Sequence, residues 1–65
     1  MPAELAEFLR QKGIEAERWW ASLTPEAQAY QAEAFATLGA VAYAQRWAFY
    51  FSQWRRLYPL SKSGA

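Results

Sequence analysis

The stretch from Ser22 to Glu26, Ser-Leu-Thr-Pro-Glu, decides the fold because it predicts where one helix ends and a longer one begins. Thr24 is a favourable N-cap, Pro25 suits the first helical position, and Glu26 complements the positive end of the helix dipole. The next comparable stop is Pro59, which disfavours helical geometry at the residue before it. The sequence therefore predicts a helix over about 25–57.

Before this stretch, the apolar residues follow a helical period. At about 100° per residue they fall within one broad stripe, formed by Leu5, Phe8, Leu9, Ala16, Trp19, Trp20 and Leu23. Gly13 interrupts the segment, either as a kink or as the residue that ends a short first helix, with Ile14 making the accompanying hydrophobic contact. We expect helix over about 3–23, interrupted or kinked near Gly13.

After Pro25, the apolar face of the predicted helix changes sides. One set of residues, Ala27, Tyr30, Ala34, Phe35, Leu38, Val41 and Ala42, marks one face, and a second set, Tyr43, Trp47, Tyr50, Phe51, Trp54, Leu57 and Tyr58, marks nearly the opposite face. A single straight amphipathic helix does not normally change faces in this way. Either the helix is continuous and forms a helical hairpin with 3–23, or it breaks near Gly39 and forms a three- or four-helix mini-bundle. We favour the continuous helix because no proline or cap cluster follows Gly39.

Composition indicates the all-α class and a single domain. The chain has 65 residues, of which 54% are hydrophobic, and it contains one valine and one isoleucine, too few to build strands. We expect the domain to span 1–58, followed by a C-terminal tail over 59–65 that is frayed from Leu60 onward. Charge is divided unevenly, because all six acidic residues precede position 34 and the later residues carry only arginine and lysine.

Catalytic and metal-binding chemistry has little support in this sequence. Histidine, cysteine and aspartate are all absent, and these side chains are the commonest acid–base groups, nucleophiles and metal ligands. The three glycines are isolated, so no phosphate-binding loop is present. We predict that the protein is not an enzyme and that it uses no cofactor, metal or small-molecule substrate.

The predicted functional site is the aromatic stripe near the C-terminus, together with the arginines beside it. Large aromatic side chains at helical spacing form either a core or an interface, and Trp, Tyr and Arg are enriched at interfaces. The candidate partner-binding residues are Trp47, Tyr50, Phe51, Trp54, Leu57, Arg46, Arg55 and Arg56. The competing interpretation is that the stripe forms the core of the domain.

These patterns predict a non-catalytic accessory or regulatory protein that docks through its C-terminal aromatic helix onto a larger protein or its own copy. The first alternative is an amphipathic-helix protein at a membrane surface, and the second is a small nucleic-acid-binding or transcription regulator. Nucleic acid is the least favoured partner because the basic residues are few. No signal-peptide pattern or membrane-spanning run is apparent, so we expect the cytoplasm or the cytoplasmic face of a membrane.

Overall fold

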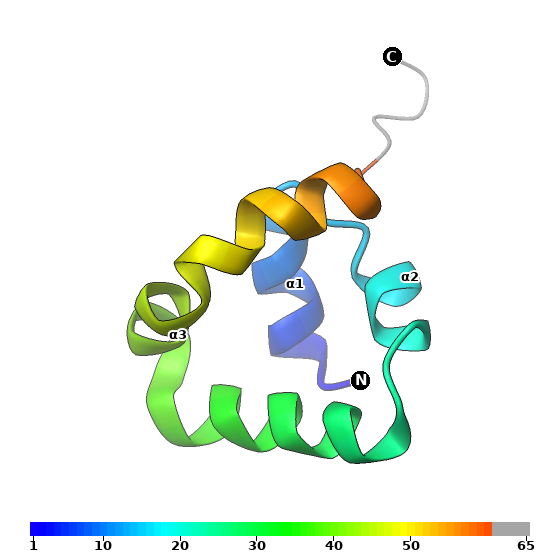
Figure 1. Ribbon diagram of the computed structural model, residues 1–65. Helices are drawn as coiled ribbons and strands as arrows, with labels where there is room; N and C mark the ends of the chain where they lie inside the picture. The colour runs from blue at the N-terminus through cyan, green and yellow to red at the C-terminus, as the bar shows by residue number, and fades with distance from the viewer. Residues whose placement is uncertain (61–65) are drawn as a thin grey trace.

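The computed structural model describes residues 1–60 and is helical throughout most of them. Its helices are α1 (Ala3–Gln11), α2 (Ala16–Ala21) and α3 (Pro25–Leu57), arranged as Figure 1 shows. Within these 60 residues the only β-type pairing is an isolated bridge between Ile14 and Pro59. The all-α class predicted from composition is confirmed.

The interruption predicted near Gly13 is a helix C-terminus of the Schellman type. Gly13 has a φ of 82°, the left-handed region that glycine adopts without a steric penalty. Its backbone N–H donates to the Arg10 carbonyl at 2.9 Å, and the N–H of Ile14 donates to the Leu9 carbonyl at 3.0 Å. Ile14 is fully buried, as the predicted hydrophobic contact requires.

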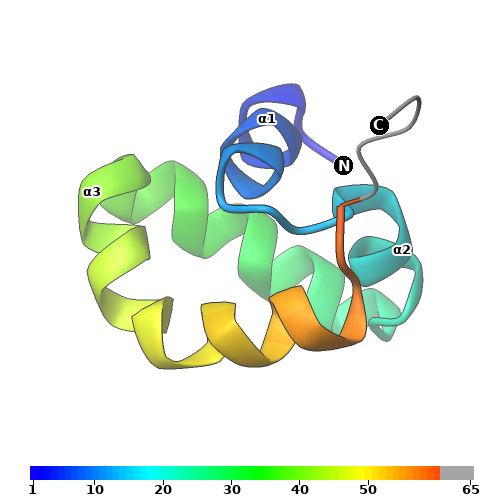
Figure 2. The same cartoon turned by 90° about the horizontal axis from the view of Figure 1, so that it is seen from above.

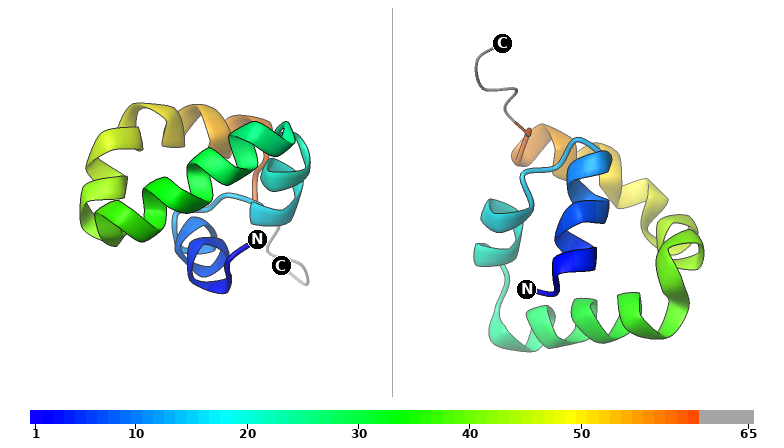
Figure 3. Two further views of the ribbon diagram at one scale, coloured as in Figure 1. Left: turned by 90° about the horizontal axis from the view of Figure 1, so that it is seen from below. Right: turned by 180° about the vertical axis from the view of Figure 1, so that it is seen from behind.

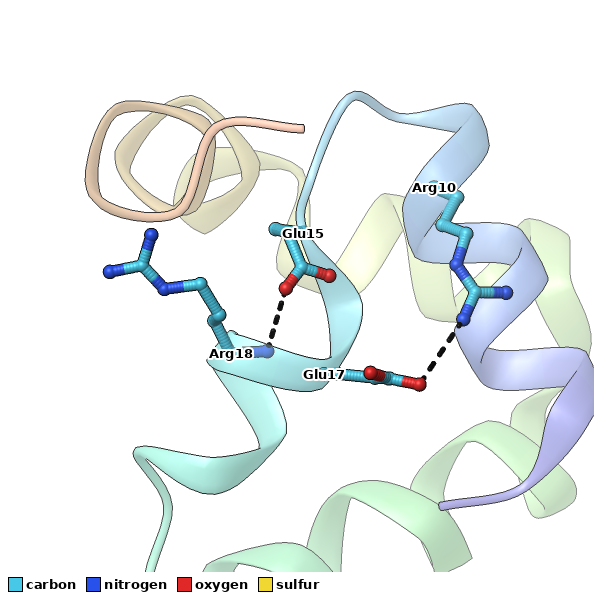
Figure 4. Close-up of polar contacts among 4 residues, drawn as sticks. All are labelled: Arg10, Glu15, Glu17 and Arg18. Atoms are coloured by element: carbon cyan, nitrogen blue, oxygen red, sulfur yellow. Dashed lines mark hydrogen bonds and ion pairs between the residues drawn. The ribbon is translucent and has the colours of Figure 1, made fainter. Parts of the chain in front are cut away.

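α2 is a short helix whose two ends are capped by side chains. At its start, the Glu15 carboxylate accepts a hydrogen bond from the Arg18 backbone N–H at 3.3 Å (Figure 4). At its end, the Gln28 side-chain amide donates to the Trp20 carbonyl at 2.9 Å, which connects α2 to the first turns of α3. The ion pair of Arg10 and Glu17 at 3.9 Å is exposed, so it contributes little stability.

α3 begins as predicted and then bends at Gly39. Thr24 Oγ1 accepts a hydrogen bond from the Ala27 N–H at 3.1 Å, and Pro25 opens the helix. At Gly39, φ is 82° and ψ is 167°, and these backbone angles lie outside the helical region. The chain turns there, so that residues 40–57 fold back above residues 25–38 (Figure 1).

The predicted span of about 25–57 is confirmed for α3, but the straight course that we favoured is wrong, because the chain bends near Gly39, where the alternative placed a break. The physical reason is burial. A straight α3 would carry the aromatic residues after position 42 beyond the reach of α1, whereas the turn returns them to it. The conformation at the turn is one that only glycine adopts readily.

The core lies where α1 rests against the frame formed by α2 and the two parts of α3 (Figure 3, right). Its buried residues come from every helix and are Leu5, Ala6, Leu9, Ile14, Ala16, Trp19, Tyr43, Trp47 and Phe51. Aromatic rings dominate it. The Tyr43 ring stacks on Trp47 with centroids 4.7 Å apart and meets the edge of Phe35 at 5.3 Å.

The end of α3 is fastened to the connection between α1 and α2. The Glu15 N–H donates to the Tyr58 carbonyl at 2.7 Å, and the Leu60 N–H donates to the Gly13 carbonyl at 3.1 Å. Pro59 and Leu60, predicted to belong to the C-terminal tail, are instead paired with residues 13–15, so Leu60 is not frayed as predicted. The rest of the predicted tail, 61–65, lies outside the described residues.

Candidate partner-binding surface

The inner face of residues 40–57 is core. Trp47 and Phe51 are buried, and Trp54 is half-buried with its ring centroid 4.8 Å from that of Trp19. We predicted these three aromatics as partner-binding residues, but the bend at Gly39 turns their face inward. The structure agrees here with the competing interpretation that the stripe forms the core, because Trp47 and Phe51 are buried and Trp54 packs against the core.

Arg55 is exposed, but it lies on the other side of the helix from Arg46. Its Nη1 donates a hydrogen bond to the Lys12 carbonyl at 3.0 Å, and its aliphatic stem runs close to Gly13. Its observed contact is thus with the connection between α1 and α2, where it helps to hold the end of α3.

The other four predicted residues are exposed on the outer face of α3. Tyr50 is 46% exposed and Leu57 is 57% exposed, and Arg46 and Arg56 lie beside them in the exposed class. At helical spacing Arg46, Tyr50 and Leu57 lie in one row at the edge of the buried stripe, and Arg56 lies farther round on the outer side of the helix. Part of the predicted set therefore lies together at the surface.

Phe49 is the residue that the sequence analysis missed. Its side chain is 82% exposed, more than any other large hydrophobic residue described, and its ring meets that of Tyr50 edge-on at 5.6 Å. The sequence carried a signal for it, because Phe49 falls at helical spacing between the polar residues Arg46, Gln53 and Arg56. We call the exposed set of Arg46, Phe49, Tyr50, Gln53, Arg56 and Leu57 the ridge.

The ridge combines apolar area with positive charge. Phe49 and Tyr50 supply aromatic surface, and Tyr50 is further supported by stacking on Trp54 at 6.0 Å. The Arg46 guanidinium lies 5.4 Å from the Trp47 ring centroid, which restrains that side chain. No acidic residue occurs from position 34 onward, so the local charge favours an anionic contact.

Within residues 1–60, no three acidic side chains come close enough together to hold a metal ion. The most perturbed titratable group described is Tyr43, whose pKa is raised far above its ordinary value because the hydroxyl is buried. That hydroxyl donates to Gln31 Oε1 at 2.6 Å, so it belongs to the core.

None of the helices over residues 1–60 combines the length and apolar character needed to cross a membrane. The chain matches no protein-family model, no curated protein and no solved structure. The arguments for its function therefore rest on the surface geometry.

Proposed function

We propose that this protein is a non-catalytic accessory or regulatory protein that docks through the ridge onto a larger partner protein. The observation that carries the proposal is the exposure of Phe49 on a helix whose opposite face is already packed into the core. Transfer of a phenyl ring from water into an apolar pocket lowers the free energy by about 25 cal/mol per Å² of apolar surface buried. Adjacent Tyr50 and the nearby arginines are the side-chain types that dominate binding energy at interfaces.

The chemistry of the ridge defines the partner surface that fits it. Phe49 requires an apolar pocket, and Arg46 and Arg56 require carboxylates on opposite sides of that pocket. An arginine can meet a carboxylate through two parallel hydrogen bonds, which adds directional specificity to the charge attraction. The expected partner is a protein with an apolar cleft and an acidic rim.

A protein partner is favoured over a membrane surface by the way the helix uses its apolar residues. A helix that lies in a lipid interface presents its broad apolar face to the acyl chains. In residues 40–57 that broad face, with Tyr43, Trp47 and Phe51, is buried against α1 and the rest of the core. The face left for a partner is narrow, with Phe49 at its centre.

The test compares three tagged forms of the full chain in the native host: the wild type, Phe49→Ala, and the control Val41→Ala. Val41 is 74% exposed on the same helix and is outside the ridge, so its substitution removes a comparable exposed apolar group. We expect one protein to bind the wild type and Val41→Ala and to be lost with Phe49→Ala. The same dependence must hold with that protein purified, and added salt must weaken the complex.

Two outcomes would contradict the proposal. The first is equal retention of every captured protein by Phe49→Ala and the wild type. The second is a blue shift of tryptophan emission when vesicles of phosphatidylserine and phosphatidylcholine are added at low salt, lost in Phe49→Ala, because that result assigns the ridge to a lipid surface instead.

A further inference from the structure

A second surface feature, which shares no residue with the ridge, is a groove between α1 and the middle of α3. Its volume is about 710 Å³. One wall is α1 and the other is the stretch of α3 that leads into the Gly39 turn. The lining residues are Pro2, Ala3, Glu4, Glu7, Phe8, Gln11, Ala32, Phe35, Ala36, Gly39 and Ala40.

The groove is apolar inside and acidic at its edge. Phe8 and Phe35, whose ring centroids are 5.6 Å apart, form its aromatic part, and alanines and glycine form the rest of the α3 wall. Glu4 and Glu7 are exposed along the α1 side. No lysine or arginine lines the groove, although the Lys12 ammonium lies 5.4 Å from the Phe8 ring centroid.

The ridge has the complementary character. Phe49 would fill the apolar groove, and Arg46, three residues before it, would face a carboxylate of the rim. Glu4 and Glu7 both line the groove on its α1 side and both are exposed, so either carboxylate is accessible to an arginine of another copy. We infer that the groove is a docking site for the ridge of a second copy of this chain, an inference that rests on the proposed docking role of the ridge.

The two surfaces are distinct, which determines the kind of assembly. The groove is lined by α1 and residues up to Ala40, whereas the ridge begins at Arg46, so no residue belongs to both surfaces. In the view of Figure 2, α1 lies at one edge of the fold and the end of α3 at the other. One copy can therefore offer its ridge and its groove at the same time. Contacts of this head-to-tail kind build rings or open chains, whereas a two-fold dimer uses the same patch on both copies.

The experiment uses two single variants of the full chain, each of which disables one surface. Phe49→Ala removes the ridge anchor and leaves the groove intact. Ala36→Arg fills the groove with a cationic side chain at an exposed position and leaves the ridge intact. The matched control is Ala29→Arg, at an exposed position of the same helix that does not line the groove.

Sedimentation velocity over a wide range of protein concentration gives the readout. We expect the wild type and Ala29→Arg to associate as concentration rises. Each disabling variant should have a dissociation constant about tenfold higher, or should not associate at all. A mixture of Phe49→Ala with Ala36→Arg should form a one-to-one pair and nothing larger, because one intact ridge meets one intact groove. Salt should weaken every one of these contacts.

Two results would overturn the inference: a wild type that stays monomeric throughout, or a mixture of the two variants that does not pair. These results leave the proposed function standing if a larger partner is still lost with Phe49→Ala. Self-association that is unchanged in Phe49→Ala removes the ridge as the contact, and it overturns the proposed function as well if that variant also keeps every captured protein.

Discussion

The Tyr43 hydroxyl donates a hydrogen bond of 2.6 Å to Oε1 of Gln31, twelve residues earlier in the chain. Twelve residues of straight α-helix span about 18 Å, so this bond exists only because α3 turns at Gly39. Both side chains are buried. The bond gives the Tyr43 hydroxyl an acceptor and the Gln31 amide oxygen a donor. The pair therefore fixes how the two parts of α3 meet.

Replacement of Tyr43 by phenylalanine should destabilise the protein by about 1–3 kcal/mol, because the buried Gln31 amide loses its partner. Urea unfolding followed by tryptophan fluorescence measures the change. In the double variant Tyr43→Phe with Gln31→Leu, no polar group is left unpaired, so most of the lost stability should return. A double variant no more stable than Tyr43→Phe would mean that the hydrogen bond is not what the Gln31 side chain contributes.

Stability should fall at alkaline pH in a way that depends on Tyr43. Burial raises the pKa of the Tyr43 hydroxyl far above the value of about 10 that it has in an unfolded chain. The native state then keeps a proton that the unfolded state loses, so the contribution is complete below pH about 10 and decreases above it, by about 1.4 kcal/mol per pH unit. Urea midpoints on both sides of that pH should separate the wild type from Tyr43→Phe, which lacks this part of the slope. Parallel pH profiles for the two proteins would contradict the assignment.

Substitution of Gly39 by alanine should cost about 1–3 kcal/mol, because its φ of 82° and ψ of 167° are strained for any residue with a Cβ. The cost comes from the backbone alone, since no atom lies within 4 Å of the position that a Cβ would take. Alanine also favours straight helix, so circular dichroism should show unchanged or higher helicity at the lowered stability. A Gly39→Ala protein as stable as the wild type and with the same fold would show that the turn is not strained.

Trp47 and Phe49, two residues apart, should respond in opposite ways to alanine substitution. Trp47→Ala removes a buried ring and should cost about 3–5 kcal/mol, a large part of the stability of so small a domain. Phe49→Ala removes an exposed ring and should change the free energy of unfolding by about 0.5 kcal/mol or less. Thermal unfolding of the two variants beside the wild type provides the measurement. Equal destabilisation by both would contradict the division of this helix into a core face and a docking face.

The sequence predicted the features that depend on neighbouring residues. Thr24 and Pro25 specified the start of α3, and Gly13 with Ile14 specified the end of α1, because caps are formed within one turn of the chain. The turn at Gly39 was not favoured, since no local stop surrounds it. The free energy that stabilises this turn comes from contacts of Tyr43, Trp47 and Phe51 with residues far away in sequence.

The same cause explains the partial success at the candidate site. The aromatic stripe was correctly placed on one face of the helix, but whether that face lies inside or outside depends on the bend. Once residues 40–57 fold back, Trp47, Phe51 and Trp54 pack into the core, whereas Tyr50 and Leu57 at the edge of the stripe stay exposed beside the polar face. Phe49 is a large aromatic residue among polar neighbours on that face. The clustering of apolar residues in the sequence therefore does not indicate it.

The fold-back at Gly39 is the claim on which the ridge depends, and proton–proton nuclear Overhauser effects test it most directly. The ring centroids of Phe35 and Tyr43 are 5.3 Å apart, whereas eight residues of straight helix would separate them by about 12 Å. We predict cross-peaks between the ring protons of Phe35 and Tyr43, and further cross-peaks from both rings to Phe8. An uninterrupted series of helical amide contacts through Gly39, with no cross-peak between Phe35 and Tyr43, would contradict the account.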